Sequence, residues 1–349
     1  MILRNQNDIM KEWPKNCDTP LVSIRCLAYN HENFISQALD GFLMQKTNFP
    51  FEIIVHDDAS TDNTASIIRM YEMKYPKIVK PIYEKENQYS KKNGSLARIV
   101  NAVCKGKYIA YCEGDDFWID SEKLKKQVEV LENDDSCSLV HTDFITVDEN
   151  SNEIFNPYRA FFDRDAKKEK GLVYLFNRNY IMTLSVVVRR TLWLNPIYIN
   201  CPEASLDYAI FFSAAFNGNI RYLSTSTCAY RMNSASITHT QGPKLYKGLY
   251  KIYQYFAELF FVEKIKKVPI LDYMKILFYA EANFIRRLDF KWVLRILRYN
   301  KIGFVVLPLS MVRGAWLRFL GHYNALKIKI KFFLVDVLRI YDENVSDDE

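Results

Sequence analysis

Short apolar runs alternate with stretches of helical periodicity through the first 145 residues. Five apolar runs bounded by turn residues have the length of buried strands, at 21–28, 51–56, 78–83, 107–112 and 138–144. Between these runs, apolar residues recur three and four positions apart, which predicts helices at 35–42, 62–75, 95–104 and from 120 past 131. This alternation predicts an α/β domain with a doubly wound, mainly parallel, Rossmann-like sheet.

The rest of the chain differs from this first part. Residues 146–240 are less regular, with a strand predicted at 182–189 and a helix at 207–216, and residues 241–341 have a helical pattern. We therefore expect a polar N-terminal extension at 1–19, a main domain at 20–240 and a helical region at 241–341. The final segment, 342–349, holds five acids and is expected to be a solvated tail.

Composition narrows the class of protein. Apolar residues make up 49% of the 349 residues and charged residues 25%, which is typical of a globular protein. The seven cysteines form no C-x-x-C pair, so we expect reduced thiols in a cytoplasmic protein and no structural zinc site. We expect no signal peptide, and the longest apolar run, 302–312, is shorter than the ~20 residues that span a bilayer.

Positive charge is concentrated in the helical region. Residues 244–341 carry 19 Lys or Arg against 6 Asp or Glu, about +13, while the whole chain carries +6. Helical spacing brings these basic residues together with Trp292 and Trp316, a pattern typical of helices on anionic membrane surfaces. This predicts peripheral attachment to the cytoplasmic membrane face; the alternative is a helical subdomain with a solvated basic face. Nucleic acid is not an expected partner, because no nucleic-acid-binding motif accompanies the charge.

Polar clusters follow three of the predicted strands. Residues 29–32 follow the first strand, Asp57 and Asp58 the second, and residues 113–116 the fourth. Ligands of doubly wound sheets bind at the carboxyl ends of the strands. We therefore expect the three clusters to lie along one edge of the sheet and to form a single binding site.

The run Glu113-Gly114-Asp115-Asp116 has the chemistry of a cation site. Adjacent carboxylates repel each other, and Mg²⁺ or Mn²⁺ compensates such a pair, typically together with substrate phosphates. Gly114 allows the backbone to turn tightly. The alternative is a polar turn whose acids cap the helix that follows Ser121.

The other two clusters have the chemistry of a nucleotide site. A carboxylate of Asp57 or Asp58 at a strand end can accept the imide N–H of uracil or a ribose hydroxyl. The alternative for this segment is helix capping by Asp62 and Thr64. Tyr29, directly after a strand, can stack on a base, which is worth ~1–3 kcal/mol; the alternative is a simple turn.

Three segments together resemble a known family. Residues 21–32, 52–64 and 106–118, in this order and at these separations, closely resemble the inverting family-2 glycosyltransferases of GT-A fold, of the bacterial surface-polysaccharide type. The resemblance is close over about 20–145 and looser over 180–235. It implies a GT-A domain with a nucleotide-binding half at about 20–145 and an acceptor half at about 146–240.

The resemblance implies a role for each matching residue. Tyr29 would stack on the base, Asp58 would bond it, and Asp116 would bind Mn²⁺ or Mg²⁺ beside Asp115. The residues that it implies for binding the nucleotide-sugar are Ala28, Tyr29, Asn30, Glu32, Asp57, Asp58, Glu113, Asp115 and Arg231. The segment around Arg231 resembles the one that closes the site over the diphosphate in the family.

The resemblance also implies a catalytic base and an acceptor side. Asp207 matches the acid that takes a proton from the acceptor in the family; the alternative is an N-cap for the helix that follows. Trp118 and Tyr208 are implied on the acceptor side. Asn233 stands where the family has a histidine, and His239 is a nearby substitute or a lone surface histidine.

The implied reaction moves a sugar from a nucleotide-sugar, by family habit a UDP-sugar, to a hydroxyl of a glycan or lipid-linked glycan. A divalent metal neutralises the departing diphosphate, Asp207 takes the acceptor's proton, and one in-line displacement inverts the anomeric carbon. One alternative is a nucleotidyltransferase, which normally has a Gly-rich loop where this chain has 29–32. Another is a sugar-nucleotide-binding or membrane scaffold protein without catalysis, against which the intact acids count.

Overall fold

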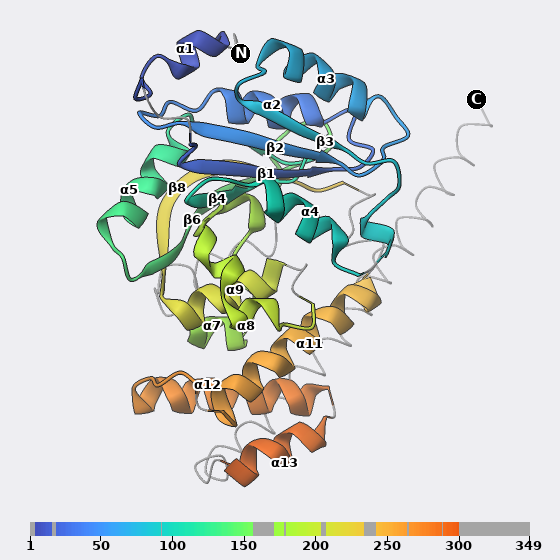
Figure 1. The fold of residues 1–349 in the computed structure, drawn as a ribbon. Helices are drawn as coiled ribbons and strands as arrows, with labels where there is room; N and C mark the ends of the chain where they lie inside the picture. Colours follow the sequence, from blue (N-terminus) through green and yellow to red (C-terminus); the bar gives the residue numbers. More distant parts are fainter. Residues whose placement is uncertain are drawn as a thin grey trace, which may run out of the picture. The chain divides into compact units, whose positions relative to one another are not determined.

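The computed structural model describes residues 4–15, 19–91, 93–155, 171–177, 179–203, 207–233, 242–263, 265–287 and 289–299. The chain forms two compact units, Met1–Phe256 and Ala257–Glu349. In the described part of the first unit, eight strands form one sheet in the order β3-β2-β1-β4-β7-β6-β8-β5 (Figure 1). The α/β fold class predicted from the sequence is confirmed.

Four parallel strands make one half of the sheet: β1 (Val22–Ala28), β2 (Phe51–Asp57), β3 (Val79–Tyr83) and β4 (Tyr108–Tyr111). β1 lies between β2 and β4, with Val22 opposite Phe51 on one side and Tyr108 on the other. β1 and β2 are buried on both faces, which is why their sequences are nearly continuous apolar runs. These four strands begin and end within one residue of their predicted limits.

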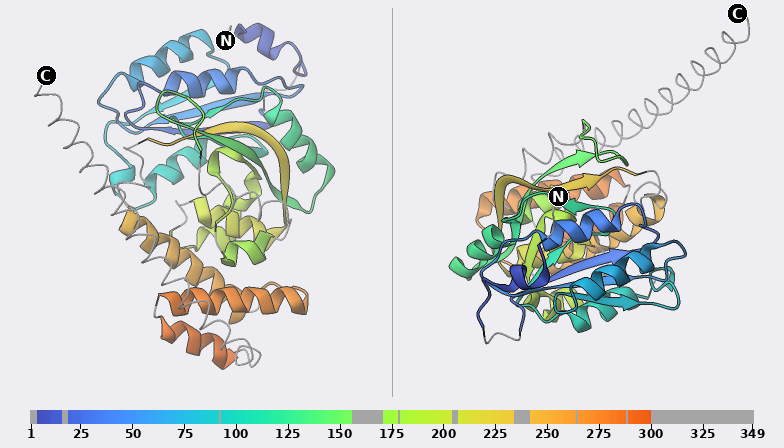
Figure 2. Two further views of the ribbon diagram at one scale, coloured as in Figure 1. Left: turned by 180° about the vertical axis from the view of Figure 1, so that it is seen from behind. Right: turned by 90° about the horizontal axis from the view of Figure 1, so that it is seen from above.

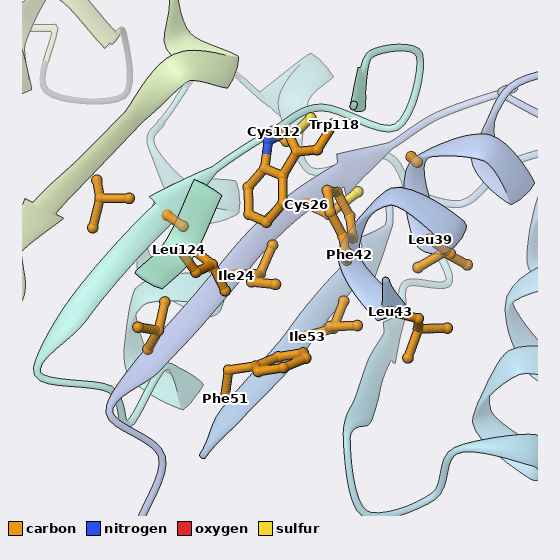
Figure 3. Close-up of a cluster of buried hydrophobic side chains, with 14 of the residues drawn as sticks. Ile24, Cys26, Leu39, Phe42, Leu43, Phe51, Ile53, Cys112, Trp118 and Leu124 are labelled. Atoms are coloured by element: carbon orange, nitrogen blue, oxygen red, sulfur yellow. The ribbon is translucent and has the colours of Figure 1, made fainter. Parts of the chain in front are cut away.

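Helices cover both faces of this half. α2 (Ile35–Leu43) and α3 (Thr64–Lys74) lie on one face and α4 (Ser95–Val103) on the other (Figure 1). Ile24 and Ile53 point from the strands toward Phe42 of α2, and the ring of Trp118 meets Phe42 edge-on at 4.8 Å (Figure 3). A Cβ on Gly41 would lie 2.9 Å from the backbone N of Trp118, so only glycine lets α2 approach this closely.

The other half of the sheet contains β5 (Phe117–Trp118), β6 (Cys137–Val147), β7 (Val186–Arg189) and β8 (Asn219–Arg231). β7 is antiparallel to both β4 and β6, while β6 and β8 are long, parallel to each other and strongly curved (Figure 2). Four of the seven strand pairings are parallel. The sequence pattern predicts no strand at 219–231, and the predicted strand at 182–189 begins with a 3₁₀ turn, Thr183–Ser185.

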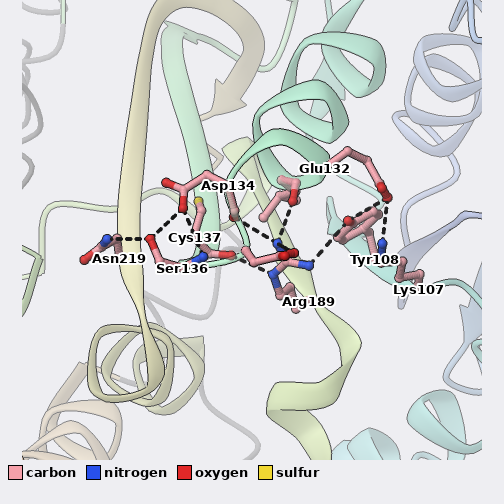
Figure 4. Close-up of polar contacts among 10 residues, drawn as sticks. Lys107, Tyr108, Glu132, Asp134, Ser136, Cys137, Arg189 and Asn219 are labelled. Atoms are coloured by element: carbon pink, nitrogen blue, oxygen red, sulfur yellow. Dashed lines mark hydrogen bonds and ion pairs between the residues drawn. The ribbon is translucent and has the colours of Figure 1, made fainter.

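Arg189, at the end of β7, joins three elements (Figure 4). Its guanidinium donates to the carbonyl of Leu131 in α5 (Lys123–Asn133), to that of Asp134 just after α5, and to that of Cys137 at the start of β6. These carbonyls lie near the C-terminal end of a helix, where a cation is favoured. The apolar face predicted for α5 is confirmed, because Leu124 and Leu131 are fully buried.

Further helices in the described part of the first unit are α7 (Gly171–Asn177), α8 (Pro196–Ile199) and α9 (Asp207–Asn217). Phe212 of α9 packs edge-on against Phe176 of α7 at 5.1 Å and stacks on Phe256 of α11 (Gly242–Phe261) at 4.7 Å. The N-terminal extension carries α1 (Gln6–Met10), and its Ile9 belongs to the main core.

The second unit contains the end of α11, α12 (Ile270–Arg286) and α13 (Phe290–Tyr299). Tyr273 stacks on Phe260 at 5.6 Å, and Arg295 pairs with Glu258. Helices are thus present up to residue 299, while the rest of the predicted helical region and the acidic tail lie outside the described residues. Among the helices that the structure describes, none combines the length and hydropathy needed to cross a membrane.

Candidate active site

Three loops meet at the carboxyl edge of the parallel strands, as the sequence predicts. The backbone N–H of Asp58, after β2, donates to the carbonyl of Ala28 at the end of β1, at 2.9 Å. On the other side of β1, the N–H of Gly114, after β4, donates to the carbonyl of Leu27 at 2.8 Å. The polar clusters 29–32, 57–62 and 113–116 therefore lie next to one another.

Gly114 is required by space. A Cβ at this position would lie 2.8 Å from Nδ1 of His31 and 3.2 Å from the Cβ of Ala28. The loop after β4 thus passes directly over the end of β1, and this close approach explains the glycine better than a special turn angle. Nδ1 of His31 is buried and has no hydrogen-bond partner among the described residues.

The loops after β1 and β2 are held together by side chains expected to line the nucleotide pocket. Asn30, in the left-handed region with φ 56°, accepts a hydrogen bond from the N–H of Thr61 at 2.8 Å. Glu32 accepts from the N–H of Asn63 at 3.0 Å. Asn30 and Glu32 therefore order the loops, while Tyr29, 45% exposed, remains available for stacking on a base.

Asp57 and Asp58 are both buried, and their carboxylates bind backbone amides. The two oxygens of Asp58 accept from the N–H groups of Gln88 at 2.6 Å and Tyr89 at 3.0 Å. Asp57 accepts from the N–H of Ser60 at 3.3 Å. Asp58 thus holds the segment after β3 at the carboxyl edge of the sheet. The N–H of a nucleotide base could donate only to the lone pairs of Asp58 that these amides leave unused.

Asp115 and Asp116 form the acidic centre of the edge. Asp116 is 7% exposed and accepts from the N–H of Arg231 at 2.7 Å. Burial raises the pKa of Asp116 well above its ordinary value, and the negative charge of Asp115 adds to the rise. Asp115 accepts from Nδ2 of Asn233 at 3.0 Å, so the residue in place of the family's histidine contacts this site.

Arg231 is buried beneath the acidic centre. Its guanidinium donates to the carbonyls of Asp115 at 2.8 Å and of Asp148 and Glu149 at 3.0 Å, and to Oε1 of Gln37 at 2.6 Å. These bonds use most of its donors. Arg231 therefore links the acidic loop to the turn after β6, and its role in binding a diphosphate stays a prediction.

Asp207, the expected base, is the first residue of α9. Its carboxylate accepts from the hydroxyl of Thr183 at 2.6 Å. Burial raises the pKa of Asp207, while the Thr183 hydrogen bond and the charge of Arg25 oppose the rise. A raised pKa brings a carboxylate closer to the operating pH, where general bases are most effective.

Glu113, in the acidic loop, contacts strand β1 at two points. One of its oxygens lies 3.7 Å from Nη1 of Arg25, and the other accepts from the N–H of Leu27 at 3.2 Å. Burial raises the pKa of Glu113 to about 8, Arg25 lowers it, and Asp207 and Asp115 raise it. Arg25 and Thr183 are contacts that the sequence argument missed; an arginine inside the apolar run 21–28 was the available signal.

The two aromatic residues expected on the acceptor side belong to the core. Trp118 is 2% exposed and donates from its indole N–H to the carbonyl of Leu184 at 3.1 Å. Tyr208 is buried and donates to the carbonyl of Leu175. Both rings are buried, and a large ring gains more from burial than from a place at a wet rim.

The described residues contain no cluster of three or more His, Cys, Asp or Glu that is arranged to hold a metal ion. Asp115 and Asp116 nevertheless supply two adjacent carboxylates, of which Asp116 is buried and accepts from the backbone N–H of Arg231. Hard oxygen donors of this number suit Mg²⁺ or Mn²⁺ when substrate phosphates complete the coordination.

Comparison with solved structures supports the fold. A crystal structure of TarS from S. aureus in complex with UDP-GlcNAc superposes with a TM-score of 0.54 at 17% identity, and covers 84% of this chain and 88% of that chain. At an identity this low, the superposition shows a similar fold and nothing beyond the fold.

Two bacterial proteins are among the sequence relatives of this chain. An uncharacterised protein of Mycobacterium tuberculosis (strain ATCC 25618 / H37Rv) is 33% identical over 231 residues, which cover 63% of this chain and 61% of that protein. The chain thus spans about three-fifths of that relative's length. The UDP-Glc:alpha-D-GlcNAc-diphosphoundecaprenol beta-1,3-glucosyltransferase WfgD of Escherichia coli is 26% identical over 232 residues, covering 65% of this chain and 83% of WfgD.

A family model identifies the part of the chain that builds the site. The model described as glycosyl transferase family 2 matches residues 23–189, which include β1, β2, β4, the acidic loop 113–116 and the contacts of Arg25. Together with the sheet order and the position of the acids at its carboxyl edge, this match shows that residues 23–189 form a glycosyl transferase family 2 domain.

Proposed function

We propose that this protein transfers a sugar from a nucleotide-sugar to an acceptor hydroxyl. The observation that carries the proposal is the meeting, in a family 2 domain, of exposed Tyr29 with Asp115 and Asp116 at the carboxyl ends of neighbouring parallel strands. An aromatic ring next to a carboxylate pair provides stacking for a base and a site for a metal-bound diphosphate.

The donor that we propose is a UDP-sugar. WfgD is named as an enzyme that uses UDP-Glc, and the TarS structure contains UDP-GlcNAc. At the edge described here, Tyr29 would stack on uracil and Asp58 would accept its imide N–H. The supporting observations are the exposure of Tyr29 and the position of Asp58 two strands away from Asp116.

The proposed transfer is a single displacement. The oxygen of the acceptor hydroxyl bonds to the anomeric carbon, and the bond from that carbon to the diphosphate breaks. Asp207 accepts the proton of the acceptor hydroxyl in the same step. When bound by Asp115 and Asp116, Mn²⁺ or Mg²⁺ supplies the positive charge that stabilises the departing diphosphate. Attack opposite to the leaving group inverts the anomeric carbon.

The acceptor that we propose is a glycan or lipid-linked glycan at the cytoplasmic face of a membrane. WfgD is named for a diphosphoundecaprenol-linked acceptor. In the second unit, Ile270, Leu271 and Leu294 are 59%, 69% and 66% exposed, and Lys267 and Lys291 are exposed close to them in sequence. Exposed apolar residues among lysines favour an anionic lipid surface.

Asp207→Asn tests the proposed reaction. A panel of nucleotide-sugars with Mn²⁺ first identifies the donor by thermal shift, where a hundredfold excess over Kd adds ~2.7 kcal/mol to stability. We expect the variant to bind this donor like the wild type. The rates of sugar transfer and of donor hydrolysis should both fall by about 10²-fold or more, because the amide cannot accept the proton.

Asp135→Asn is the matched control, since its carboxylate is fully exposed and remote from the carboxyl edge. It should leave donor binding and turnover unchanged. If Asp207→Asn turns over at the wild-type rate, Asp207 is not the base. If no nucleotide-sugar of the panel stabilises the protein, the proposed donor class is wrong.

A further inference from the structure

Strand β7 brings a short turn to the carboxyl edge of the parallel strands. β7 runs antiparallel to β4, with Val187 opposite Ala110. The residues that precede Val187 therefore continue past the end of β4, toward the acidic loop 113–116 that follows it. The 3₁₀ turn Thr183–Ser185, directly before β7, thus lies at the same edge of the sheet as the expected donor site.

Buried polar side chains of the core hold the backbone of this turn. The indole N–H of Trp118 donates to the carbonyl of Leu184 at 3.1 Å. Nζ of Lys123 and Nε2 of Gln127, both in α5, donate to the carbonyl of Ser185 at 3.1 Å and 2.9 Å. Lys123 and Gln127 are fully buried. Two successive carbonyls of the turn are therefore fixed from inside the domain.

Lys123 is an unusual residue for a core. A buried ammonium loses several kcal/mol of hydration unless hydrogen bonds and nearby charge compensate it. Burial accordingly lowers the pKa of Lys123 to about 8, and its Nζ lies 5.0 Å from the ring centre of Trp118. An apolar side chain could fill this space but could not bind the carbonyl of Ser185. The polar contacts thus restrict the turn more than apolar packing would.

Thr183, the first residue of the turn, contacts the expected base. Its hydroxyl donates to Oδ2 of Asp207 at 2.6 Å, a length typical of a hydroxyl that donates to an ionised carboxylate. Asp207 is half-buried. Among the described residues, none donates a hydrogen bond to its other oxygen, Oδ1. The turn therefore fixes one oxygen of the carboxylate and leaves the other for a further donor.

We propose that Thr183 is a positioning residue for the transfer reaction, whose hydroxyl holds Oδ2 of Asp207 so that Oδ1 takes the proton of the acceptor hydroxyl. The inference rests on the proposed function, in which Asp207 is the base. A base that is itself oriented by a third group is a general arrangement in catalysis. The competing account is structural: the same bond only ties the turn to the start of α9.

Three single substitutions in the full chain separate these accounts. Thr183→Val removes the hydroxyl at nearly the same shape, and Thr183→Ser keeps it. Thr191→Val is the matched control, because Thr191 is exposed and lies beyond the other end of β7. The rate is measured as UDP released from UDP-glucose or UDP-GlcNAc with Mn²⁺, where water takes the place of the acceptor. Thermal shift gives the Kd of the donor.

We expect Thr183→Val to lower kcat by about tenfold or more, because a hydrogen bond to a charged group is lost. The Kd of the donor should not change, since the hydroxyl acts on the base rather than on the donor. Thr183→Ser should restore most of the wild-type kcat, and Thr191→Val should keep it. In the Asp207→Asn background, Thr183→Val should have little further effect, because no ionised base is left to orient.

Each other outcome contradicts a definite statement. Wild-type kcat in a folded Thr183→Val, with Asp207→Asn impaired, overturns the inference and leaves the proposed base in place. An equal loss from Thr183→Val with and without Asp207→Asn, or no recovery in Thr183→Ser, also overturns it in favour of the structural account. Wild-type kcat in Asp207→Asn, or no UDP release from the wild type, overturns the proposed function together with the inference. If Thr183→Val does not fold, Thr183→Ala carries the test.

Discussion

His141 shows how burial of a single residue sets a pH limit on stability. It lies in β6, is 2% exposed, and its ring packs between Tyr180 at 5.8 Å and Tyr222 at 5.1 Å. Its Nε2 has no hydrogen-bond partner among the described residues. Burial lowers the pKa of His141 to about 3, and the charge of Lys123 contributes in the same direction.

His141→Phe should remove this pH dependence. The unfolded chain binds the proton near pH 6.5 and the folded chain only near pH 3, so stability is complete above pH 6.5 and falls as the pH drops through this window. Relative to its value at pH 7, wild-type stability at pH 5 should lose about 2 kcal/mol more than that of the variant. Urea unfolding at the two pH values measures this, and parallel losses in both proteins would contradict it.

At the residue scale, the sequence predicted where a residue lies in the fold better than it predicted the hydrogen-bond partners of its side chain. The acids at 115 and 116 could be placed because a strand ends where its apolar run ends. The bonds of Arg231 could not, because its acceptors Asp148 and Glu149 belong to a turn about eighty residues earlier in the chain. The contacts of Asn30 and Glu32 with the loop after β2 could not be predicted either, while their place in the nucleotide pocket stays a prediction.

At the scale of elements, Arg189 should be a major source of stability. Arg189→Met leaves the carbonyls of Leu131, Asp134 and Cys137 without a charged donor, and each such hydrogen bond is worth ~1.5–3 kcal/mol. Because water can reach part of the site, we expect a loss of about 2–4 kcal/mol. Chemical unfolding of the two proteins gives the difference.

Arg190 is the matched control for this measurement. It follows Arg189 directly, but its Nε has no hydrogen-bond partner among the described residues. Arg190→Met should change the unfolding free energy by less than about 1 kcal/mol. Equal effects at 189 and 190 would mean that the loss reflects general removal of arginine in this segment.

β1, β2 and β4 were predictable because they are buried on both faces and therefore mostly apolar. β8 was not, since its burial pattern is irregular and several of its central residues are exposed or half-buried. Its register against β6 also shifts at Thr142 and Asp143, and bulges of this kind break the period of two that betrays a strand.

At the scale of the whole molecule, membrane attachment should depend on the second unit. In the full chain, the double substitution Ile270→Asp, Leu271→Asp should weaken binding to phosphatidylglycerol vesicles about thirtyfold, if each side chain contributes about 1 kcal/mol of apolar burial. Flotation of vesicles with protein measures it. The matched control is the double substitution Leu194→Asp, Ile199→Asp, because these two residues of the first unit are similarly exposed.

Weak flotation of the wild type itself, or equal weakening by both pairs of substitutions, would argue for a helical subdomain that is simply solvated. The sequence predicted the helices of this region from their periodicity, but it could not show which apolar residues remain exposed, because that depends on how the helices pack.

The hydrogen bonds between the loops after β1 and β2 affect the thermodynamics of donor binding. Thr61 is bound to Asn30 and Asn63 to Glu32 before any ligand arrives. These two loops have therefore already lost, before the ligand binds, the conformational entropy that a flexible pocket would lose on binding. Nucleotide association should accordingly be governed by contacts and desolvation, with little ordering of this part of the wall, and its heat capacity change should stay close to that of the buried ligand surface alone.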